Sequence, residues 1–394
     1  MHQQRTRVAI IGAGPAGLLL GHLLAARGIP FAVVEHRSRD RVLSRVRAGV
    51  LEQSSVDVLE SLGLADGLHA DGLVHGGIHL QHEQERFHID FEALVGRTVT
   101  VYGQQRVQAD LMAAHDALGS TVLYDAADVT PADDGDPVVR FTIDGEPHEL
   151  HADFIVGADG FHGVTKSLIP PALLAPVERE YDAAWLGVLA DVPPSTDELI
   201  YALHPDGFAM HSMRSPEVSR LYVQVEPDER LEEWSDDRVW DALDTRLAVP
   251  GWRLEHGPIT EKAITRMRSS VVSTLAHGRV LLVGDAGHIV PPTGAKGLNS
   301  AVADVAMLGA ALAEQAGGDE SALASYSDRA LARQWKVQQF SQSMTDLLHV
   351  PGATTPADER QFRYRSRVGQ LRYISGSRFA QQSIAEQYTG LAIR

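Results

Sequence analysis

The chain has 394 residues, and its 35 Lys and Arg against 52 Asp and Glu leave a formal net charge of −17. This length predicts two or three domains, or one large one, with an ample core. Cysteine is absent, which excludes disulfides, thiolate metal sites and a cysteine nucleophile. So acidic a chain is a poor candidate for binding nucleic acid or an anionic membrane, because phosphate attraction requires a basic surface.

Two further exclusions follow from the pattern of residues. The polar stretch Met1 to Arg7 leads directly into an apolar one, so no signal peptide is visible, and the apolar runs are far shorter than a membrane span. The 18 histidines are scattered without metal-ligand spacing, so no metal site is expected. These features predict a cytoplasmic globular protein.

The first elements along the chain form a βαβ unit. Residues 7–11 predict a buried strand, Leu18 to Arg27 predict a helix that ends at Gly28, and residues 31–35 predict a second strand. The turn between the first strand and the helix reads Gly-Ala-Gly-Pro-Ala-Gly, with glycines at Gly12, Gly14 and Gly17.

Glycines at this spacing permit a tight turn, the close approach of a pyrophosphate and close packing of helix on strand. Glu35 ends the second strand, where its carboxylate can accept hydrogen bonds from a ribose diol. The unit therefore predicts a dinucleotide-binding site.

The following elements change in character. Arg45 to Gln53 is expected to open a helix that runs towards Leu62, and residues 121–157 predict strands with a hairpin turn at Asp144-Gly145. Strands are then predicted at 185–191, 199–203, 208–214 and 219–225. Turn residues separate these strands, which indicates an antiparallel sheet of hairpins.

The last third returns to the first pattern. A helix is predicted at 235–248, an apolar strand at 280–283, a long helix from Asn299 to Gln315, and mostly helix beyond it. The sequence thus predicts an α/β protein in which a discontinuous Rossmann-like domain contains an inserted antiparallel substrate domain and is followed by a helical C-terminal region. The expected boundaries are 1–178 and 269–315 for the Rossmann-like domain, 179–268 for the insert and 316–394 for the helical region.

Three motifs identify the family that the sequence resembles: Gly-Ala-Gly-Pro-Ala-Gly at 12–17, Gly-Ala-Asp-Gly at 157–160 and Gly-Asp-Ala-Gly-His at 284–288. Together they resemble the class A flavoprotein aromatic monooxygenases. Longer strings, such as Thr-Val-Tyr-Gly-Gln at 100–104 and Pro-Pro-Thr-Gly-Ala-Lys-Gly-Leu-Asn at 291–299, resemble the members that act on 4-hydroxybenzoate.

The resemblance implies FAD, NADH or NADPH as electron donor, and O2 as co-substrate. The implied product is 3,4-dihydroxybenzoate, formed through a flavin hydroperoxide. The implied FAD contacts, besides the three glycines and Glu35, are Arg45, Arg47, Gln104, Asp159, Arg220, Asp285, Gly294, Leu298 and Asn299. The helix that begins near Leu298 would direct its positive end at a reduced, anionic flavin.

The resemblance also indicates which residues would bind the aromatic acid. Arg214 is expected to pair with the carboxylate, with hydrogen bonds from Ser212 and Tyr222. Tyr201 is expected to accept the phenol proton and pass it to Tyr388 and His75. The carbonyl of Pro292 and the main chain of Thr293 complete this set.

The resemblance places the nicotinamide donor at Arg37, Arg41, His162, Lys166 and Arg268. Arginines near residue 40 suit a 2′-phosphate, yet related sequences with such segments favour NADH, so both donors stay open. The family also implies a homodimer. Two alternatives remain: the same fold acting on 3-hydroxybenzoate or 4-aminobenzoate, or a non-hydroxylating FAD reductase or redox sensor.

Overall fold

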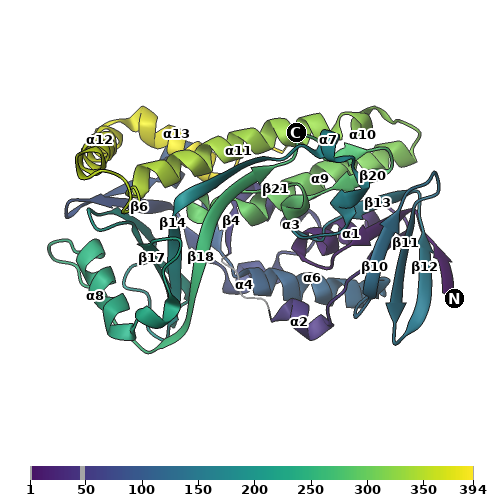
Figure 1. Cartoon of the computed structure of the whole chain (residues 1–394), viewed down its shortest axis with the longest axis horizontal. Coiled ribbons are helices and arrows are strands. Elements are labelled where there is room, and N and C mark those ends of the chain that lie inside the picture. The colour runs from purple at the N-terminus through teal and green to yellow at the C-terminus, as the bar shows by residue number, and fades with distance from the viewer. Residues whose placement is uncertain (1, 45–48, 394) are drawn as a thin grey trace.

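The structure is a computed structural model that describes residues 2–44 and 49–393. Arg45 and Arg47, both predicted FAD contacts, lie outside the described residues. Within the described residues the strands form four sheets, and the helices gather around two of them (Figure 1).

The central sheet of the first domain brings distant segments together. Its strand order is β19 (Ala276–His277), β20 (Val280–Leu282), β13 (Phe154–Gly157), β2 (Val8–Ile11), β3 (Phe31–Val34) and β9 (Val122–Leu123). All of these pairings are parallel except that between β19 and β20. The return of the chain near residue 280 beside the first strand confirms the discontinuous Rossmann-like fold.

Apolar side chains explain why this sheet is covered on both faces. On one face, α1 (Pro15–Ala25) packs against α6 (Gln104–Leu118) and α9 (Gly297–Ala316). On the other face, the sheet packs against a smaller sheet, whose strand order is β1 (His2–Arg5), β12 (Glu146–His151), β11 (Val138–Ile143) and β10 (Ala127–Ala132). Burial on both faces accounts for the continuous apolar runs of the parallel strands.

The turn between β11 and β12 confirms the predicted hairpin. Ile143 pairs with Glu146, and the two residues between them, Asp144 and Gly145, have φ of 52° and 80°. Positive φ at both central residues is the geometry that Asp-Gly favours in two-residue hairpins.

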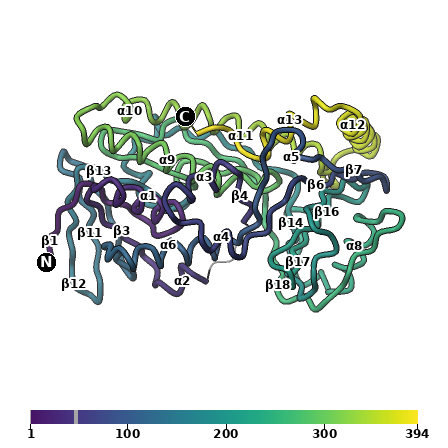
Figure 2. Tube along the Cα trace, turned by 180° about the vertical axis from the view of Figure 1, so that it is seen from behind, coloured from purple at the N-terminus to yellow at the C-terminus, as the bar shows by residue number. Residues whose placement is uncertain are grey.

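The second large sheet carries the predicted substrate strands. Its order is β21 (His288–Ile289), β18 (Ile259–Val271), β14 (Val177–Ala190), β17 (Val218–Val225), β16 (Ala209–Ser215), β15 (Leu199–Leu203), β6 (Gly77–His82) and β7 (Glu85–Asp90). One face packs on α8 (Asp236–Leu247), and the other on α11 (Tyr326–Leu348), α12 (Ala357–Gly376) and α13 (Arg378–Thr389). Figure 2 shows β6 and β7 close to α12 and α13.

Two features of this region differ from the sequence-based expectation. The sheet is larger than the insert, because β6 and β7 come from the first segment and β6 pairs with β15 in parallel. Within the described part of the segment expected to open a helix at Arg45, residues 50–52 form strand β4 (Val50–Glu52), which α3 (Gln53–Ser61) follows. Strand β4 pairs with β8 (Val99–Val101), which also pairs with β5 (Leu73–His75), and this pairing overrides the local helix preference.

The remaining helices are short. They are α2 (Arg39–Leu43), α4 (Asp66–Asp71), α5 (Phe91–Val95), α7 (Pro171–Leu174) and α10 (Ser321–Ala324), with single turns at Thr165–Leu168, Leu231–Glu233, Gly284–Ala286 and Pro292–Gly294. Among the described residues, no helix is long and apolar enough to cross a membrane.

Candidate active site

The glycine-rich turn after β2 is shaped by close backbone contacts. Gly12 has a φ of 107°, and a Cβ at Gly12 or Gly17 would collide with the backbone of Ala158 or Gly12 respectively. The space around Gly14 is open, and Gly14 precedes α1, which carries no side-chain cap and no acidic residue in its first turn. An uncapped helix start beside an open glycine is the arrangement that receives a phosphate group.

Glu35 is buried beside this turn. Its carboxylate accepts hydrogen bonds from the backbone N–H of Ala13 at 2.8 Å and of Arg37 at 2.9 Å. These bonds fix the carboxylate against the turn, at the end of β3, where the ribose of a bound dinucleotide would lie.

Asp159 follows β13 on the same edge of the sheet. Its Oδ2 accepts hydrogen bonds from the backbone N–H and the hydroxyl of Thr165, both at 2.9 Å, whereas its buried Oδ1 has no partner among the described residues. Burial raises the pKa of Asp159 against the opposing effect of these bonds. An orphaned carboxylate oxygen beside an open glycine turn fits a ligand such as FAD.

The start of α9 closes the other side of this region. Gly294 ends the turn Pro292–Gly294, and Leu298 and Asn299 lie in the first turn of α9, which has no side-chain cap. The Asn299 amide accepts from the backbone N–H of Glu52 at 2.9 Å and donates to the carbonyls of Val50 and Ala295 at 2.8 Å. Its side chain therefore holds β4 against the helix. Asp285 lies in the turn that follows β20, and Gln104 is the first residue of α6.

Three strands present the predicted substrate residues on one face. In the sheet, Met210 lies opposite both Tyr201 and Tyr222, and Ser212 lies opposite Arg220. Because alternate residues of a strand share a face, Tyr201, Ser212, Arg220 and Tyr222 project to the same side. Arg214 lies at an irregularity in the pairing of β16 with β17, and the charge of Arg220 acts on its guanidinium. The structure thus brings together the substrate set that the sequence predicted, and Met210 is a further member that no motif indicated.

Two arginines stand side by side on this face. Arg214 donates to Gln105 Oε1 at 2.9 Å, and its pKa is lowered by burial and then by the positive charge of Arg220. Arg220 donates from Nε to the Tyr222 hydroxyl, and Ser212 donates to the Arg220 carbonyl at 2.9 Å. Two partly buried guanidinium groups repel each other, and a bound anion would offset that repulsion.

A buried pair of phenols is formed by Tyr201, on the strand next to that of Arg214, and Tyr388 of α13. The hydroxyls of Tyr201 and Tyr388 are 2.5 Å apart, and each side chain is 1% exposed. Burial raises the pKa of both phenols, so both carry their protons at neutral pH. Adjacent hydroxyls of this kind can pass a proton along a chain of hydrogen bonds.

His75 is buried at the end of β5, where the charges of Glu198 and Asp197 act on it. Neither of its ring nitrogens has a hydrogen-bond partner among the described residues, and burial lowers its pKa to about 4. Phe91 connects the two sites, because its ring lies 5.1 Å from that of Tyr388 and its backbone N–H donates to the Gly76 carbonyl at 2.7 Å.

Sequence reasoning did not assign a role to Lys296, a buried cation next to Tyr388. The Lys296 ammonium is buried and donates to Glu52 Oε1 at 2.5 Å and to the carbonyls of Gln387 and Tyr388 at 2.6 and 3.0 Å. These bonds fasten α13, and hence Tyr388, to the first domain. The neighbouring Thr293 is buried and accepts from the Thr345 hydroxyl at 2.8 Å, which fixes the turn that starts at Pro292.

The predicted donor residues divide into two groups. His162, Lys166 and Arg268 surround the ring of Phe161, with the Lys166 ammonium 4.3 Å and the Arg268 guanidinium 3.8 Å from its centroid. Phe161 was not foreseen. Arg37 and Arg41 belong to the segment around α2, and no contact joins them to the first group among the described residues.

Comparison with known proteins gives this site its class. The family model described as FAD binding domain matches residues 5–341. The chain belongs to this family, and within it to the class A flavoprotein aromatic monooxygenases. Such an enzyme uses FAD, NADH or NADPH, and O2.

Two curated relatives span nearly the whole chain. The chain is 45% identical to p-hydroxybenzoate hydroxylase of Acinetobacter baylyi, over 99% of this chain and 96% of that protein. It is 26% identical to 3-amino-4-hydroxybenzoate 2-monooxygenase of Streptomyces cremeus, over 90% and 91% respectively.

Two solved structures share the fold at low identity. p-Nitrophenol 4-monooxygenase of Pseudomonas putida superposes with a TM-score of 0.80 at 17% identity and covers 100% of both chains. A Diels-Alderase of pyrroindomycin biosynthesis superposes with a TM-score of 0.77 at 21% identity, over 98% of this chain and 81% of that one. Since that enzyme is described by another reaction, the fold alone does not fix the chemistry.

Proposed function

We propose that this enzyme hydroxylates 4-hydroxybenzoate to 3,4-dihydroxybenzoate. The observation that carries the proposal is one side of the large sheet, where Arg214 and Arg220 lie on β16 and β17, and Tyr201, hydrogen-bonded to Tyr388 of α13, lies on the neighbouring strand β15. An acid with a carboxylate at one end and a phenol at the other end of its ring would satisfy both pairs at once. The 45% identity to a p-hydroxybenzoate hydroxylase supports the same substrate.

Each side chain has a separate task in this proposal. Arg214 binds the carboxylate as an ion pair, and Ser212 and Tyr222 orient it. The Tyr201 hydroxyl accepts a hydrogen bond from the substrate phenol and passes its own proton to Tyr388, which leads towards His75. The substrate is then held as a phenolate, whose ring is electron-rich next to the phenol carbon. The carbonyl of Pro292 and the main chain of Thr293 limit movement of the ring.

FAD, when bound, accepts hydride from the donor and activates O2. Gly12, Gly14 and Gly17, with the start of α1, would hold its pyrophosphate, and Glu35 its ribose. Asp159, Asp285, Gln104 and Arg220 would hold the remainder, with Arg45 and Arg47 as further proposed contacts. Gly294, and the start of α9 at Leu298 and Asn299, would place positive backbone dipoles at the ring.

The donor site is proposed at the cluster around Phe161. His162, Lys166 and Arg268 suit the phosphates of NADH or NADPH, and Arg37 and Arg41 are proposed to distinguish the two donors. A nicotinamide donor and the absence of cysteine both agree with a cytoplasmic location. A homodimer is proposed, with α12 and α13 at the interface.

Flavin reduction followed by product analysis tests the proposal. The holoenzyme is reduced anaerobically with NADH or NADPH, with and without 4-hydroxybenzoate, and is then mixed with oxygen. We expect the aromatic acid to accelerate reduction and 3,4-dihydroxybenzoate to form in proportion to donor oxidised.

Parallel reactions with 3-hydroxybenzoate and 4-aminobenzoate separate the alternatives. A higher coupled yield with either acid would assign the site to that acid. If no acid accelerates reduction and no oxygenated product forms, the protein is a non-hydroxylating flavoprotein and the proposal is wrong.

A further inference from the structure

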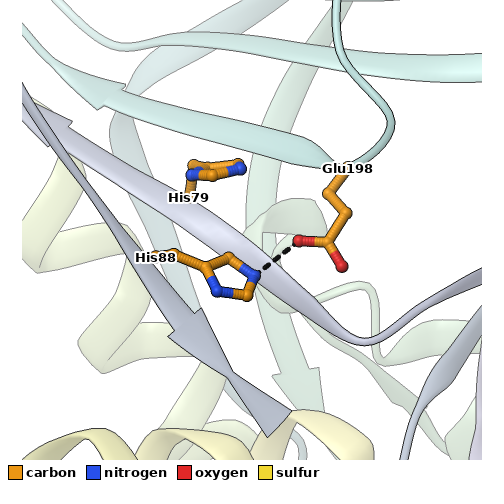
Figure 3. A group of neighbouring side chains, drawn as sticks. All are labelled: His79, His88 and Glu198. Atoms are coloured by element: carbon orange, nitrogen blue, oxygen red, sulfur yellow. Dashed lines mark hydrogen bonds and ion pairs between the residues drawn. The ribbon is translucent and has the colours of Figure 1, made fainter. Parts of the chain in front are cut away.

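Two histidines and a glutamate meet at one edge of the large sheet. His79 of β6 lies directly opposite His88 of β7 in the antiparallel pair. Glu198 immediately precedes β15, whose first residue, Leu199, pairs with Ile78. Figure 3 shows the three side chains converging on one space.

The distances within this group suit coordination. His88 Nε2 lies 2.6 Å from Glu198 Oε2, the rings of His79 and His88 are 4.9 Å apart, and one ligand atom from each residue lies within 4.8 Å of the others. A tetrahedral zinc site with metal–ligand distances near 2.0–2.1 Å places its ligand atoms about 3.3 Å apart. Small rotations of these side chains therefore reach that geometry.

The backbone around the group is arranged to hold these side chains. The Gly77 N–H donates to Glu198 Oε1 at 2.7 Å, which fixes the carboxylate and leaves its second oxygen facing the histidines. A Cβ at Gly77 would collide with the His88 ring. Glycine at this position is therefore required for the observed place of His88, and the carboxylate already accepts a backbone hydrogen bond of the kind that orients metal ligands.

The charges and the exposure of the group allow a cation to enter. The side chains of His88 and Glu198 are 38% and 19% exposed, so solvent reaches them. Imidazole nitrogens and a carboxylate oxygen are ligand atoms that a divalent transition-metal ion accepts.

We propose that His79, His88 and Glu198 bind a divalent first-row transition-metal ion, with Zn²⁺ as the representative ion. Two imidazole nitrogens and one carboxylate oxygen form a three-ligand set, and water would take the fourth position. The spacing of histidines in the sequence gave no sign of the site, because only the pairing of β6 with both β7 and β15 brings the ligands together.

The site is separate from the substrate face. Tyr201 lies opposite Leu80, whereas His79 lies opposite Ile200, and adjacent residues of a strand point to opposite faces. The metal would join β6, β7 and β15 on the side of the sheet away from Tyr201, so its role is to fasten the sheet edge, and hydroxylation does not require it.

Zinc titration of the untagged, FAD-loaded enzyme at pH 7.5 tests the site. Binding is measured by calorimetry and by competition with a fluorescent zinc chelator. We expect one site per chain, with affinity at least about tenfold lower in His79→Gln and in His88→Gln, because each loses a direct ligand. The metal should also raise the thermal midpoint of the wild-type enzyme and not that of the variants.

The matched control is His69→Gln. His69 pairs with Glu60 at 2.8 Å in an exposed ion pair that lacks a second histidine. Zinc affinity should be unchanged in this variant. Equal affinity in all four proteins, or equal loss in His69→Gln, would show that zinc binds the scattered histidines and would overturn the proposal. FAD content and the rate of donor oxidation confirm that each variant is folded.

Discussion

The Tyr201 hydroxyl is the group on which the proposed proton transfer depends. In a Tyr201→Phe variant the substrate phenol loses its hydrogen-bond partner and keeps its proton, so the ring stays less reactive. We expect flavin reduction to remain near the wild-type rate, while hydroxylation falls roughly a hundredfold or more. Stopped-flow reduction and product yield per donor oxidised measure the two steps separately.

Tyr326→Phe is the matched control for this variant. Tyr326 is equally buried and donates its hydroxyl to the Leu282 carbonyl at 2.8 Å, but it lies in the core of the first domain. Its loss should cost about 1 kcal/mol of stability and leave the coupling of hydroxylation intact. Normal product yield in Tyr201→Phe would contradict the relay.

A second residue-scale prediction concerns His349. Trp185 Nε1 donates to His349 Nε2 at 2.6 Å, and His349 Nδ1 donates to the Thr345 carbonyl at 2.9 Å, so the folded protein holds a neutral ring. Burial lowers its pKa to about 3, from 6.5 in the unfolded chain. Below pH 6.5 the unfolded state therefore binds the extra proton, and this contribution to stability is lost progressively as the pH falls towards 3.

His349→Gln removes this titration. Between pH 6.5 and 5.5 the wild-type free energy of unfolding should fall by about 1 kcal/mol more than that of the variant. Urea denaturation at both pH values and a fixed FAD concentration measures the difference. The comparison is between the pH dependences of the two free energies of unfolding. A loss of stability that is the same at both pH values therefore does not affect it. Identical slopes would show that His349 titrates with the same pKa in the folded and unfolded states.

At the scale of elements, the sequence correctly predicted the turns and strands that neighbouring residues specify. The Gly-rich turn, the Asp144-Gly145 hairpin and the strands 199–203 and 219–225 were all predicted from neighbouring residues, and the structure confirms them. Residues 50–52 were wrongly predicted as helix because their strand depends on Val99–Val101, almost fifty positions away. The Phe161 cluster and Met210 escaped prediction for the same reason, since only tertiary contacts place them.

The start of α6 provides an element-scale prediction. A Cβ at Gly103, the residue before α6, would lie 2.6–2.8 Å from the guanidinium atoms of Arg214. Gly103→Ala should therefore displace that group and break its bond to Gln105. We expect the dissociation constant of 4-hydroxybenzoate to rise about tenfold, as the loss of a charge-assisted hydrogen bond implies. Difference spectra of the flavin on substrate titration measure it.

Gly369→Ala is the control for this substitution. Gly369 lies in α12, and a Cβ there meets no atom within 4 Å among the described residues. Substrate affinity should be unchanged in that variant, and both variants should retain FAD. An unchanged dissociation constant in Gly103→Ala would show that Arg214 does not bind the substrate carboxylate.

At the scale of the whole molecule, the net charge of the chain does not determine the charge of its binding sites. The chain carries a formal charge of −17, yet the proposed aromatic acid is an anion, and FAD and the nicotinamide donor both contain phosphate. Binding then depends on a few guanidinium groups set in dry surroundings, because a charge in a low-dielectric pocket acts more strongly than distant surface charges in salt. Lys296, one of only four lysines, serves the interior as an anchor for α13.

Helix α12 and the start of α13 carry three of the four most exposed large apolar side chains of the described residues. Phe362, Tyr373 and Phe379 are 75%, 64% and 85% exposed, and Phe362 and Tyr373 are eleven residues apart, which is about three helical turns and therefore one face. An apolar face of this kind marks an interface, and a second copy of the chain is the proposed partner.

Substitution at this face tests the proposed homodimer. Wild-type enzyme should elute with about twice the 42.7 kDa mass of the chain in light-scattering chromatography, and Phe379→Glu should shift it towards the monomer at micromolar concentration, because a charge would be buried without a partner. Leu118→Glu, at a 51% exposed position at the end of α6, should leave the mass unchanged. A monomeric wild-type enzyme, or a dimer that withstands Phe379→Glu, would exclude this face as the interface.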